Sequence, residues 1–225
     1  MRRNILRILL TGTLLLNFAA CEEAIPETEA EFTVTIRNLS EGEIGTLLSG
    51  GVYYTHRMGF PLFFRSSLDY GQGLEFLAED GIVDTLLQNL ENNRYIQELG
   101  AFPDLPEGGS EVSFTLVARY GDFLNFATMF TDSNDAFYSF DEEGIHLFEP
   151  NGDPVQGDVT DKVWLWDAGT EENTQPYVGE GQPGRGPLFS GVPERRSIDL
   201  INDQFRSEYP PRFQVIQVLI SANSL

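Results

Sequence analysis

Two strongly apolar runs in this chain each lead directly into an acidic loop. The first run, Phe123–Phe130, is followed by Thr131–Phe137, and the second, Val163–Trp166, is followed by Asp167–Asn173. Short apolar runs bounded by polar loops are typical of buried β-strands. Because a strand end is a rigid position from which a loop can present charged side chains, this pattern predicts a β-sheet protein with two acidic loops at strand ends.

Three carboxylates in these loops could meet if the two strands are neighbours. Asp135 lies in the first loop, and Asp167 and Glu171 lie in the second, where Gly169 allows the chain to curl between them. Ca²⁺ prefers about 6–8 oxygen ligands from carboxylates, backbone carbonyls and water. Asp135, Asp167 and Glu171 are therefore predicted calcium ligands. The alternative is that they are turn and capping residues on an acidic surface.

Periodic apolar positions indicate further elements around these two strands. Phe32–Ile36 alternates apolar and polar residues, as a strand with one buried face does. Phe213–Ile220 is almost continuously apolar, and we expect a central strand covered on both faces. Gly73–Asn92 has helical spacing with a break at Asp80–Gly81, which predicts a pair of short helices against or beside the sheet. The expected fold is one mainly β domain over residues 32–225, an antiparallel sandwich with a short helical insertion.

The N-terminus has the organisation of a secretory signal. A basic start and a short apolar segment lead to Ala19-Ala20, directly before Cys21, the only cysteine in the chain. This context is similar to a lipobox and predicts residues 1–20 as a bacterial lipoprotein signal peptide, lipidation of Cys21, and an acidic tether over residues 21–31. The protein is thus expected in the bacterial cell envelope, lipid-anchored at the outer membrane or cell surface. An ordinary signal peptide with an incidental thiol is the alternative.

The chain is strongly acidic. Its formal charge of −21 includes three arginines before Cys21, so removal of the signal peptide would give −21 − 3 = −24. Nucleic-acid binding relies on Lys and Arg, as does unaided docking on anionic lipid. We therefore expect no nucleic-acid partner and no membrane contact except through the lipid anchor. An acidic surface with a single lysine also suits solubility in a saline habitat. The excess of acidic residues is therefore not by itself evidence for metal sites.

Known catalytic motifs are missing from the sequence. It contains no Gly-x-Ser-x-Gly, no His-Glu-x-x-His, no glycine-rich phosphate loop and no motif that would pair its cysteine with a base. His56 stands alone, and we expect a hydrogen-bonded structural residue there. A hydrolase that acts on polysaccharide through paired carboxylates is the remaining enzymatic alternative.

Four segments of the chain carry a family resemblance: Leu74–Gly81, Phe126–Phe130, Ser133–Phe137 and Leu165–Glu171. The last contains a Trp-Asp-Ala-Gly-Thr-acid motif, which is the most specific feature of the four. Together they resemble the spondin N-terminal (F-spondin) domain family, in its bacterial single-domain lipoprotein form, and the resemblance extends over residues 30–221.

The resemblance implies a C2-like antiparallel β-sandwich, extracellular placement and a bound calcium ion. By motif position, the metal-binding acids of the family fall on Asp135, Asp167 and Glu171. Glu171 departs from the animal domains, which carry Asp there. The resulting expectation is a calcium-binding adhesion or recognition module with an unknown protein or glycan ligand. A purely structural envelope protein, in which calcium only staples the fold, is a further alternative.

Overall fold

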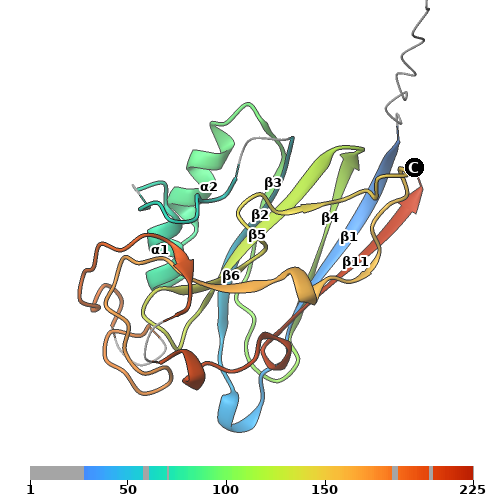
Figure 1. Cartoon of the computed structure of the whole chain (residues 1–225). Coiled ribbons are helices and arrows are strands. Elements are labelled where there is room, and N and C mark those ends of the chain that lie inside the picture. The colour runs from blue at the N-terminus through green and yellow to red at the C-terminus, as the bar shows by residue number, and fades with distance from the viewer. Residues whose placement is uncertain (1–27, 58–60, 70, 184–186, 203–204, 225) are drawn as a thin grey trace, which may run out of the picture.

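The computed structural model describes residues 28–57, 61–69, 71–183, 187–202 and 205–224. The predicted signal peptide, Cys21 and most of the predicted tether lie outside the described residues. Within them, two antiparallel sheets stack face to face, and two helices cover the outer face of the larger sheet (Figure 1). The predicted mainly β fold, a β-sandwich, is therefore confirmed.

The smaller sheet has four strands and the larger sheet has seven. The smaller sheet has the order β4 (Glu111–Arg119), β1 (Glu29–Asn38), β11 (Ile216–Ser224) and β8 (Gly157–Asp158). The larger sheet has the order β10 (Asp199–Leu200), β9 (Trp164–Asp167), β6 (Ala136–Ser139), β5 (Asp122–Phe130), β2 (Leu48–Arg57) and β3 (Ile96–Phe102), with β7 (Ile145–His146) paired to β5. The helices are α1 (Leu74–Asp80) and α2 (Asp84–Glu91), and four short 3-10 turns are η1 (Gly42–Ile44), η2 (Thr160–Lys162), η3 (Arg206–Glu208) and η4 (Arg212–Gln214).

The main core lies between the two sheets. Phe32, Val34 and Ile36 are buried on β1 while the residues between them are partly exposed, which is the period of two that the sequence predicts. They pack with Leu124, Phe126 and other buried side chains of β5 across the interface. This face fixes the register of both sheets, because a shift of one residue would turn every apolar side chain outward.

A second core lies between the larger sheet and the helices. Leu74 and Leu77 of α1 and Leu86 of α2 are buried against Phe137 and Trp166 of the sheet. The two helices are separated where the chain adopts a left-handed conformation at the glycine that follows α1, as the break in the helical pattern predicts. Since both of its faces are covered, every residue of β5 is buried.

The predicted environment of the last strand needs correction. β11 is interior in its sheet, between β1 and β8. However, only alternate residues from Ile216 onward are fully buried, so one face is packed and the other is partly open. Phe213 belongs to η4 and is 66% exposed. The doubly covered strand is instead β5, because the helices lie over the larger sheet.

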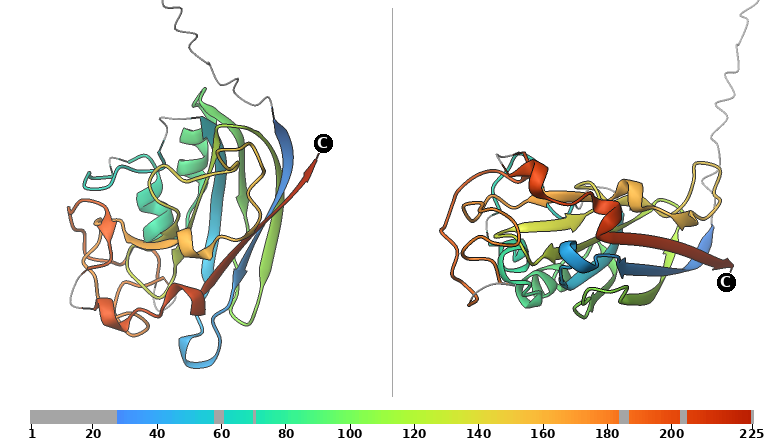
Figure 2. Two further views of the ribbon diagram at one scale, coloured as in Figure 1. Left: turned by 45° about the vertical axis from the view of Figure 1, so that its right-hand side comes forward. Right: turned by 90° about the horizontal axis from the view of Figure 1, so that it is seen from below.

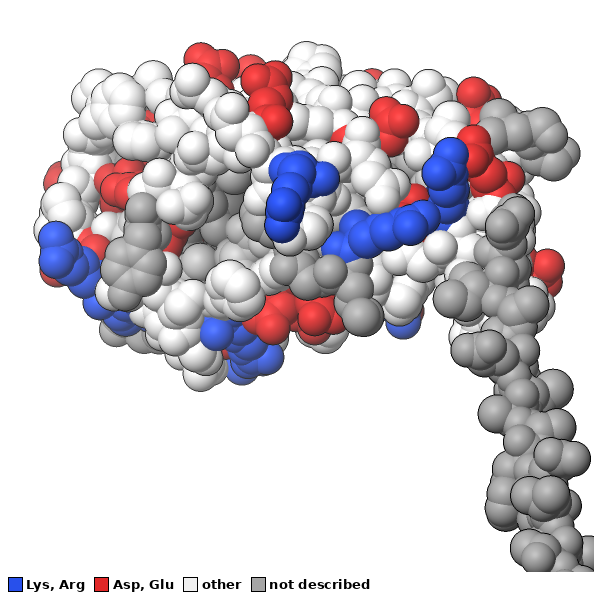
Figure 3. Space-filling model, turned by 90° about the horizontal axis from the view of Figure 1, so that it is seen from above, with Lys and Arg blue, Asp and Glu red and all other residues white. Residues whose placement is uncertain are grey.

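The two ends of the described chain lie together, away from the long loops. Ala30 pairs with Ser224 on adjacent antiparallel strands, and the described loops within residues 169–183, 187–202 and 205–210 lie at the opposite side of the sandwich (Figure 2). In the face shown in Figure 3, acidic side chains form several separate groups with basic side chains between them. Among the described residues, no helix has the length and apolar character needed to cross a membrane.

Candidate metal centre

Strand register brings the two predicted acidic loops side by side. β6 and β9 are antiparallel neighbours in which Ala136 is opposite Asp167. Asp135 immediately precedes β6, and its carbonyl oxygen accepts a 3.1 Å hydrogen bond from the N–H of Ala168. The Nε1–H of Trp166 donates to the carbonyl of Phe140 at 3.0 Å and fixes the end of β9 from the core side. Asp135 and Asp167 are therefore held at one end of the larger sheet.

Asp135 has a fully buried carboxylate with one satisfied oxygen and one unpartnered oxygen. Its side chain is 0% exposed, and Oδ2 accepts hydrogen bonds from the backbone N–H groups of Thr170 at 2.7 Å and Glu171 at 3.0 Å. Oδ1 has no hydrogen-bond partner. Burial, together with the nearby charge of Asp167, raises the pKa of Asp135 to about 8, although the two N–H donors oppose this.

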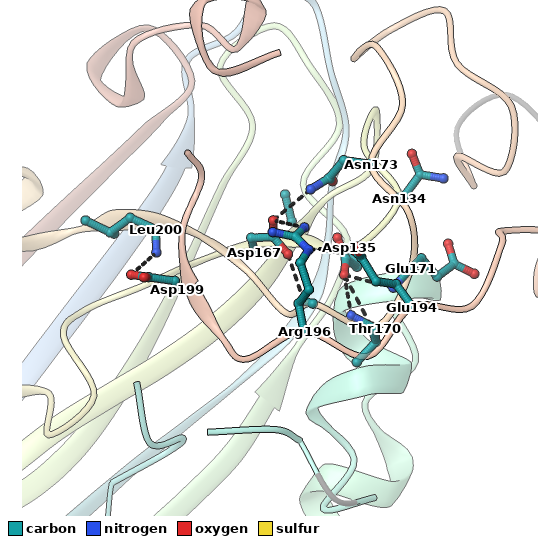
Figure 4. A network of polar contacts seen from close by, with 12 residues as sticks. Asn134, Asp135, Asp167, Thr170, Glu171, Asn173, Glu194, Arg196, Asp199 and Leu200 are labelled. Atoms are coloured by element: carbon teal, nitrogen blue, oxygen red, sulfur yellow. Dashed lines mark hydrogen bonds and ion pairs between the residues drawn. The ribbon is translucent and has the colours of Figure 1, made fainter. Parts of the chain in front are cut away.

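Asp167 is buried as well, but both of its oxygens have donors. Oδ1 accepts from the N–H of Gly169 at 2.7 Å, and Oδ2 accepts from Nδ2 of Asn173 at 2.7 Å and from Nη2 of Arg196 at 2.8 Å (Figure 4). Burial raises the pKa of Asp167, while the guanidinium of Arg196 acts in the opposite direction. A positive charge is thus already present beside the carboxylate pair.

Two backbone hydrogen bonds between the second loop and the segment Glu194–Arg196 hold Arg196 beside Asp167. The N–H of Arg196 donates to the carbonyl of Gly169 at 2.8 Å, and the N–H of Glu194 donates to the carbonyl of Thr170 at 2.6 Å. Gly169 has φ +69°, and a Cβ there would lie 2.5 Å from the carbonyl oxygen of Arg196. Only glycine allows the two segments to approach this closely.

Sequence reasoning did not identify Arg196. Its segment, residues 174–196, is rich in proline and glycine, and no local pattern indicates which arginine would return to the loops. The one available signal is the scarcity of basic residues in so acidic a chain, which makes any arginine a candidate partner for the acids.

Glu171 belongs to the same loop, but its carboxylate lies on the side of α1. The side chain is 6% exposed, and its Oε2 has no hydrogen-bond partner. Burial, followed by the charges of Glu79 and Asp80 at the end of α1, raises the pKa of Glu171 to about 7. The main chain of Glu171 contacts Asp135, whereas the side chain lies with a different set of acids.

The structure thus brings together two of the three predicted ligands. Among the described residues, no group of three or more His, Cys, Asp or Glu side chains is arranged to hold a metal ion. The donor chemistry of the pair nevertheless suits a hard cation, because the unpartnered Oδ1 of Asp135 is a buried carboxylate oxygen beside a second carboxylate, on Asp167. Such a cation would share the pair with Arg196, and calcium at this site remains a prediction.

His56 lies outside this centre. It is buried, and its ring nitrogens lie 3.1 Å from the carbonyl oxygen of Arg57 and 3.0 Å from that of Glu143. These contacts link β2 to the loop before β7, which is the structural role that the sequence predicts.

Comparison with known proteins adds no relative to this description. No protein-family model matches the chain, and no curated protein matches it. The resemblance to spondin domains therefore depends on the four motifs in the sequence.

Proposed function

We propose that this protein is a calcium-binding recognition or adhesion module of the bacterial cell envelope, anchored by a lipid on Cys21. The observation that supports it most is the buried, unpartnered Oδ1 of Asp135 beside Asp167. A buried carboxylate is stable only if it takes a proton or pairs with a cation. Calcium would be held by Asp135 and Asp167 with backbone carbonyls and water, and Glu171 would join only if its side chain turned away from α1.

Exposed apolar side chains near the acidic loops support a recognition role. Val178, Leu188, Phe189 and Val192 are all exposed, and all belong to the segment that follows the second loop. These side chains are available for contact with a ligand, and exposed apolar side chains mark an interaction site where they form a contiguous patch. This segment lies on the side of the sandwich opposite the start of β1 (Figure 2). A lipid attached before β1 would therefore leave the loops free to meet a ligand.

The carboxylate pair favours binding over hydrolysis. A glycosidase needs two carboxyl groups that flank a bound sugar, whereas Asp135 is fully buried and Asp167 is 2% exposed. A protein in which calcium is only a structural staple would not need the exposed apolar side chains of the neighbouring segment. These two observations support recognition over calcium as a mere staple and over hydrolysis at the Asp135–Asp167 pair.

Thermal unfolding tests the calcium proposal. About 2 mM CaCl₂, which suits the weak sites of extracellular modules, is expected to raise the melting temperature by about 3–5 °C relative to EDTA. Asp167→Asn should abolish this calcium-induced rise, whereas Asp161→Asn, on an exposed side chain of η2, should keep it. Glu171→Gln tests whether that side chain is a ligand: loss of the calcium-induced rise in melting temperature would show that it is, and an unchanged rise would show that it is not. Equal melting of the wild type with calcium and with EDTA would remove calcium from the proposal.

Incubation with a panel of envelope and matrix polysaccharides tests the recognition role. A binding module retains a glycan without changing it, and an enzyme releases shorter products. Product release would replace the recognition proposal with the hydrolase alternative.

A further inference from the structure

An acidic groove runs between α1 and the segments that carry Glu171 and Glu194. Its volume is about 440 Å³, which is the size of a site for a small ligand or for one or two side chains. Two arginines, Arg195 and Arg196, also line the groove against five acids, and Arg196 is already bonded to Asp167 and Glu194. The groove therefore keeps an excess of negative charge. Its acidic lining residues are Asp69, Glu75, Glu79, Glu171 and Glu194.

Glu171 lines this groove, and one of its two carboxylate oxygens is a buried acceptor without a donor. Its side chain is more than nine-tenths buried, and Oε2 has no hydrogen-bond partner. The carboxylate lies directly over Gly191, where an added Cβ would come within 1.8 Å of the carboxyl carbon. Burial, with the charges of neighbouring acids, also raises the pKa of Glu79 on the facing helix. The charges of these acids act on one another, and a cation bound in the groove would reduce their repulsion.

An apolar pocket adjoins the acidic groove. Its volume is about 540 Å³, and Leu68 and Asp69 line both cavities. Phe63, Leu86 and Ile198 form part of its wall, and Phe64, 63% exposed, stands at its rim. A ligand that fills both cavities must carry a positive charge next to a bulky apolar group.

We propose that α1 and the segments around it bind a peptide in which a basic side chain enters the acidic groove and a neighbouring aromatic or aliphatic side chain enters the apolar pocket. Charge complementarity selects the basic residue, because the five groove carboxylates exceed the arginines beside them. Arginine fits best, since its planar guanidinium can donate to Glu171 and to a second carboxylate at once. This site does not use the Asp135–Asp167 pair, and it shares with the calcium proposal only Glu171, whose side chain would have to leave the groove to bind the ion.

Titration calorimetry with short peptides tests this site in the full chain, in EDTA and at moderate salt. The probe is acetyl-Gly-Phe-Arg-Gly-amide, compared with versions in which citrulline replaces arginine or alanine replaces phenylalanine. Each replacement is expected to weaken binding about tenfold, because the first removes charge-assisted hydrogen bonds and the second removes apolar burial. Glu79→Gln should weaken the arginine probe by a similar factor, and Phe64→Ala should remove the advantage of phenylalanine.

Glu43→Gln is the matched control, since Glu43 is an exposed acid on η1 outside both cavities. It should leave peptide affinity unchanged. General attraction of a cation to an acidic protein would instead make Glu43→Gln and Glu79→Gln equivalent, and this result would overturn the proposal. Equal affinity for the arginine and citrulline peptides would do so as well. Because EDTA is present throughout, neither result bears on the calcium site.

Discussion

Arg196 places its Nη2 2.8 Å from Oδ2 of Asp167, so the protein supplies a cation of its own to the centre where the sequence predicts calcium. The Arg196 side chain is 46% exposed, while the side chain of Asp167 that it contacts is almost fully buried. This arrangement neutralises one of two neighbouring acids and leaves the other, Asp135, to a proton or to an added ion. The balance among proton, arginine and calcium at this pair can be measured.

Arg196→Met should destabilise the protein in EDTA at neutral pH. The substitution keeps much of the aliphatic stem but leaves Asp167 buried without its charged donor, and the expected loss is about 1–3 kcal/mol of unfolding free energy. The lower part of this range allows for the exposure of the guanidinium to solvent. Urea unfolding measures the change.

The adjacent Arg195 provides the control for this experiment. Arg195 is exposed, and Arg195→Met should alter the unfolding free energy by less than about 0.5 kcal/mol. Equal effects of the two substitutions would show that Arg196 does not compensate the buried charge.

Asp135 should make stability depend on pH. Its pKa in the folded protein is about 8, compared with an ordinary value of 3.8. The folded state therefore holds the proton to higher pH than the unfolded state does, and stability is lost as pH rises between these two values. In EDTA, the melting temperature should fall across this range, and Asp135→Asn should make the profile flatter.

Calcium should reduce the same loss, because a bound cation replaces the proton on the pair. Glu171 and Glu79, whose pKa values are also raised, will retain part of the slope in Asp135→Asn. Asp161→Asn, at an exposed site, should keep the full wild-type slope. Identical slopes for the wild type and Asp135→Asn would contradict a protonated Asp135.

The sequence predicts the parts of this molecule that depend on local periodicity. The alternation in β1, the apolar run of β5 and the break between α1 and α2 all follow from spacing of apolar residues. β3, Ile96–Phe102, was not predicted, because its residues mix charged, glycine and apolar positions without a clear period. Its strand conformation depends on pairing with β2, whose partner residues lie 40–51 positions earlier in the chain.

In the candidate site, too, some features could be predicted from the sequence and others could not. The proximity of Asp135 and Asp167 could be expected only in part. The two strands that were predicted to be neighbours, β5 and β9, are separated by β6, and the acids meet because β6, which begins directly after Asp135, pairs with β9. The orientation of Glu171 and the arrival of Arg196 could not be expected, since both depend on how residues 191–196 return across the second loop. Such contacts are set by tertiary packing of an irregular segment, for which sequence spacing carries no signal.

Gly169→Ala should disturb the packing of residues 191–196 against the second loop. The residue has φ +69°, and its Cβ would lie 2.5 Å from the carbonyl oxygen of Arg196. Gly121 is a matched control with φ +91° and no atom within 4 Å of an added Cβ. Gly121→Ala is expected to cost about 1–2 kcal/mol through backbone strain alone, and Gly169→Ala should cost about 1–3 kcal/mol more because of the clash. Equal losses in urea unfolding would mean that the two segments can separate freely.

Trp166→Phe should weaken the strand that carries Asp167. The indole is 1% exposed, donates to the carbonyl of Phe140 and packs edge-on against Phe63 with ring centroids 4.7 Å apart. The substitution leaves a buried carbonyl without its donor and removes part of a large ring, so the expected loss is about 2–3 kcal/mol. Trp164 lies two residues earlier on the same strand and is 40% exposed, so Trp164→Phe should cost less than about 1 kcal/mol.

The two tryptophans also give this prediction a spectroscopic readout. The protein has two tryptophans in all, so each single substitution leaves one fluorophore. The Trp164→Phe variant retains the buried Trp166, and its emission should be blue-shifted and poorly quenched by acrylamide. The Trp166→Phe variant retains the exposed Trp164, and its emission should be red-shifted and readily quenched. Equal quenching in folded samples of both variants would contradict the burial of Trp166 beneath Phe63 and, with it, the rigid strand end on which the position of Asp167 depends.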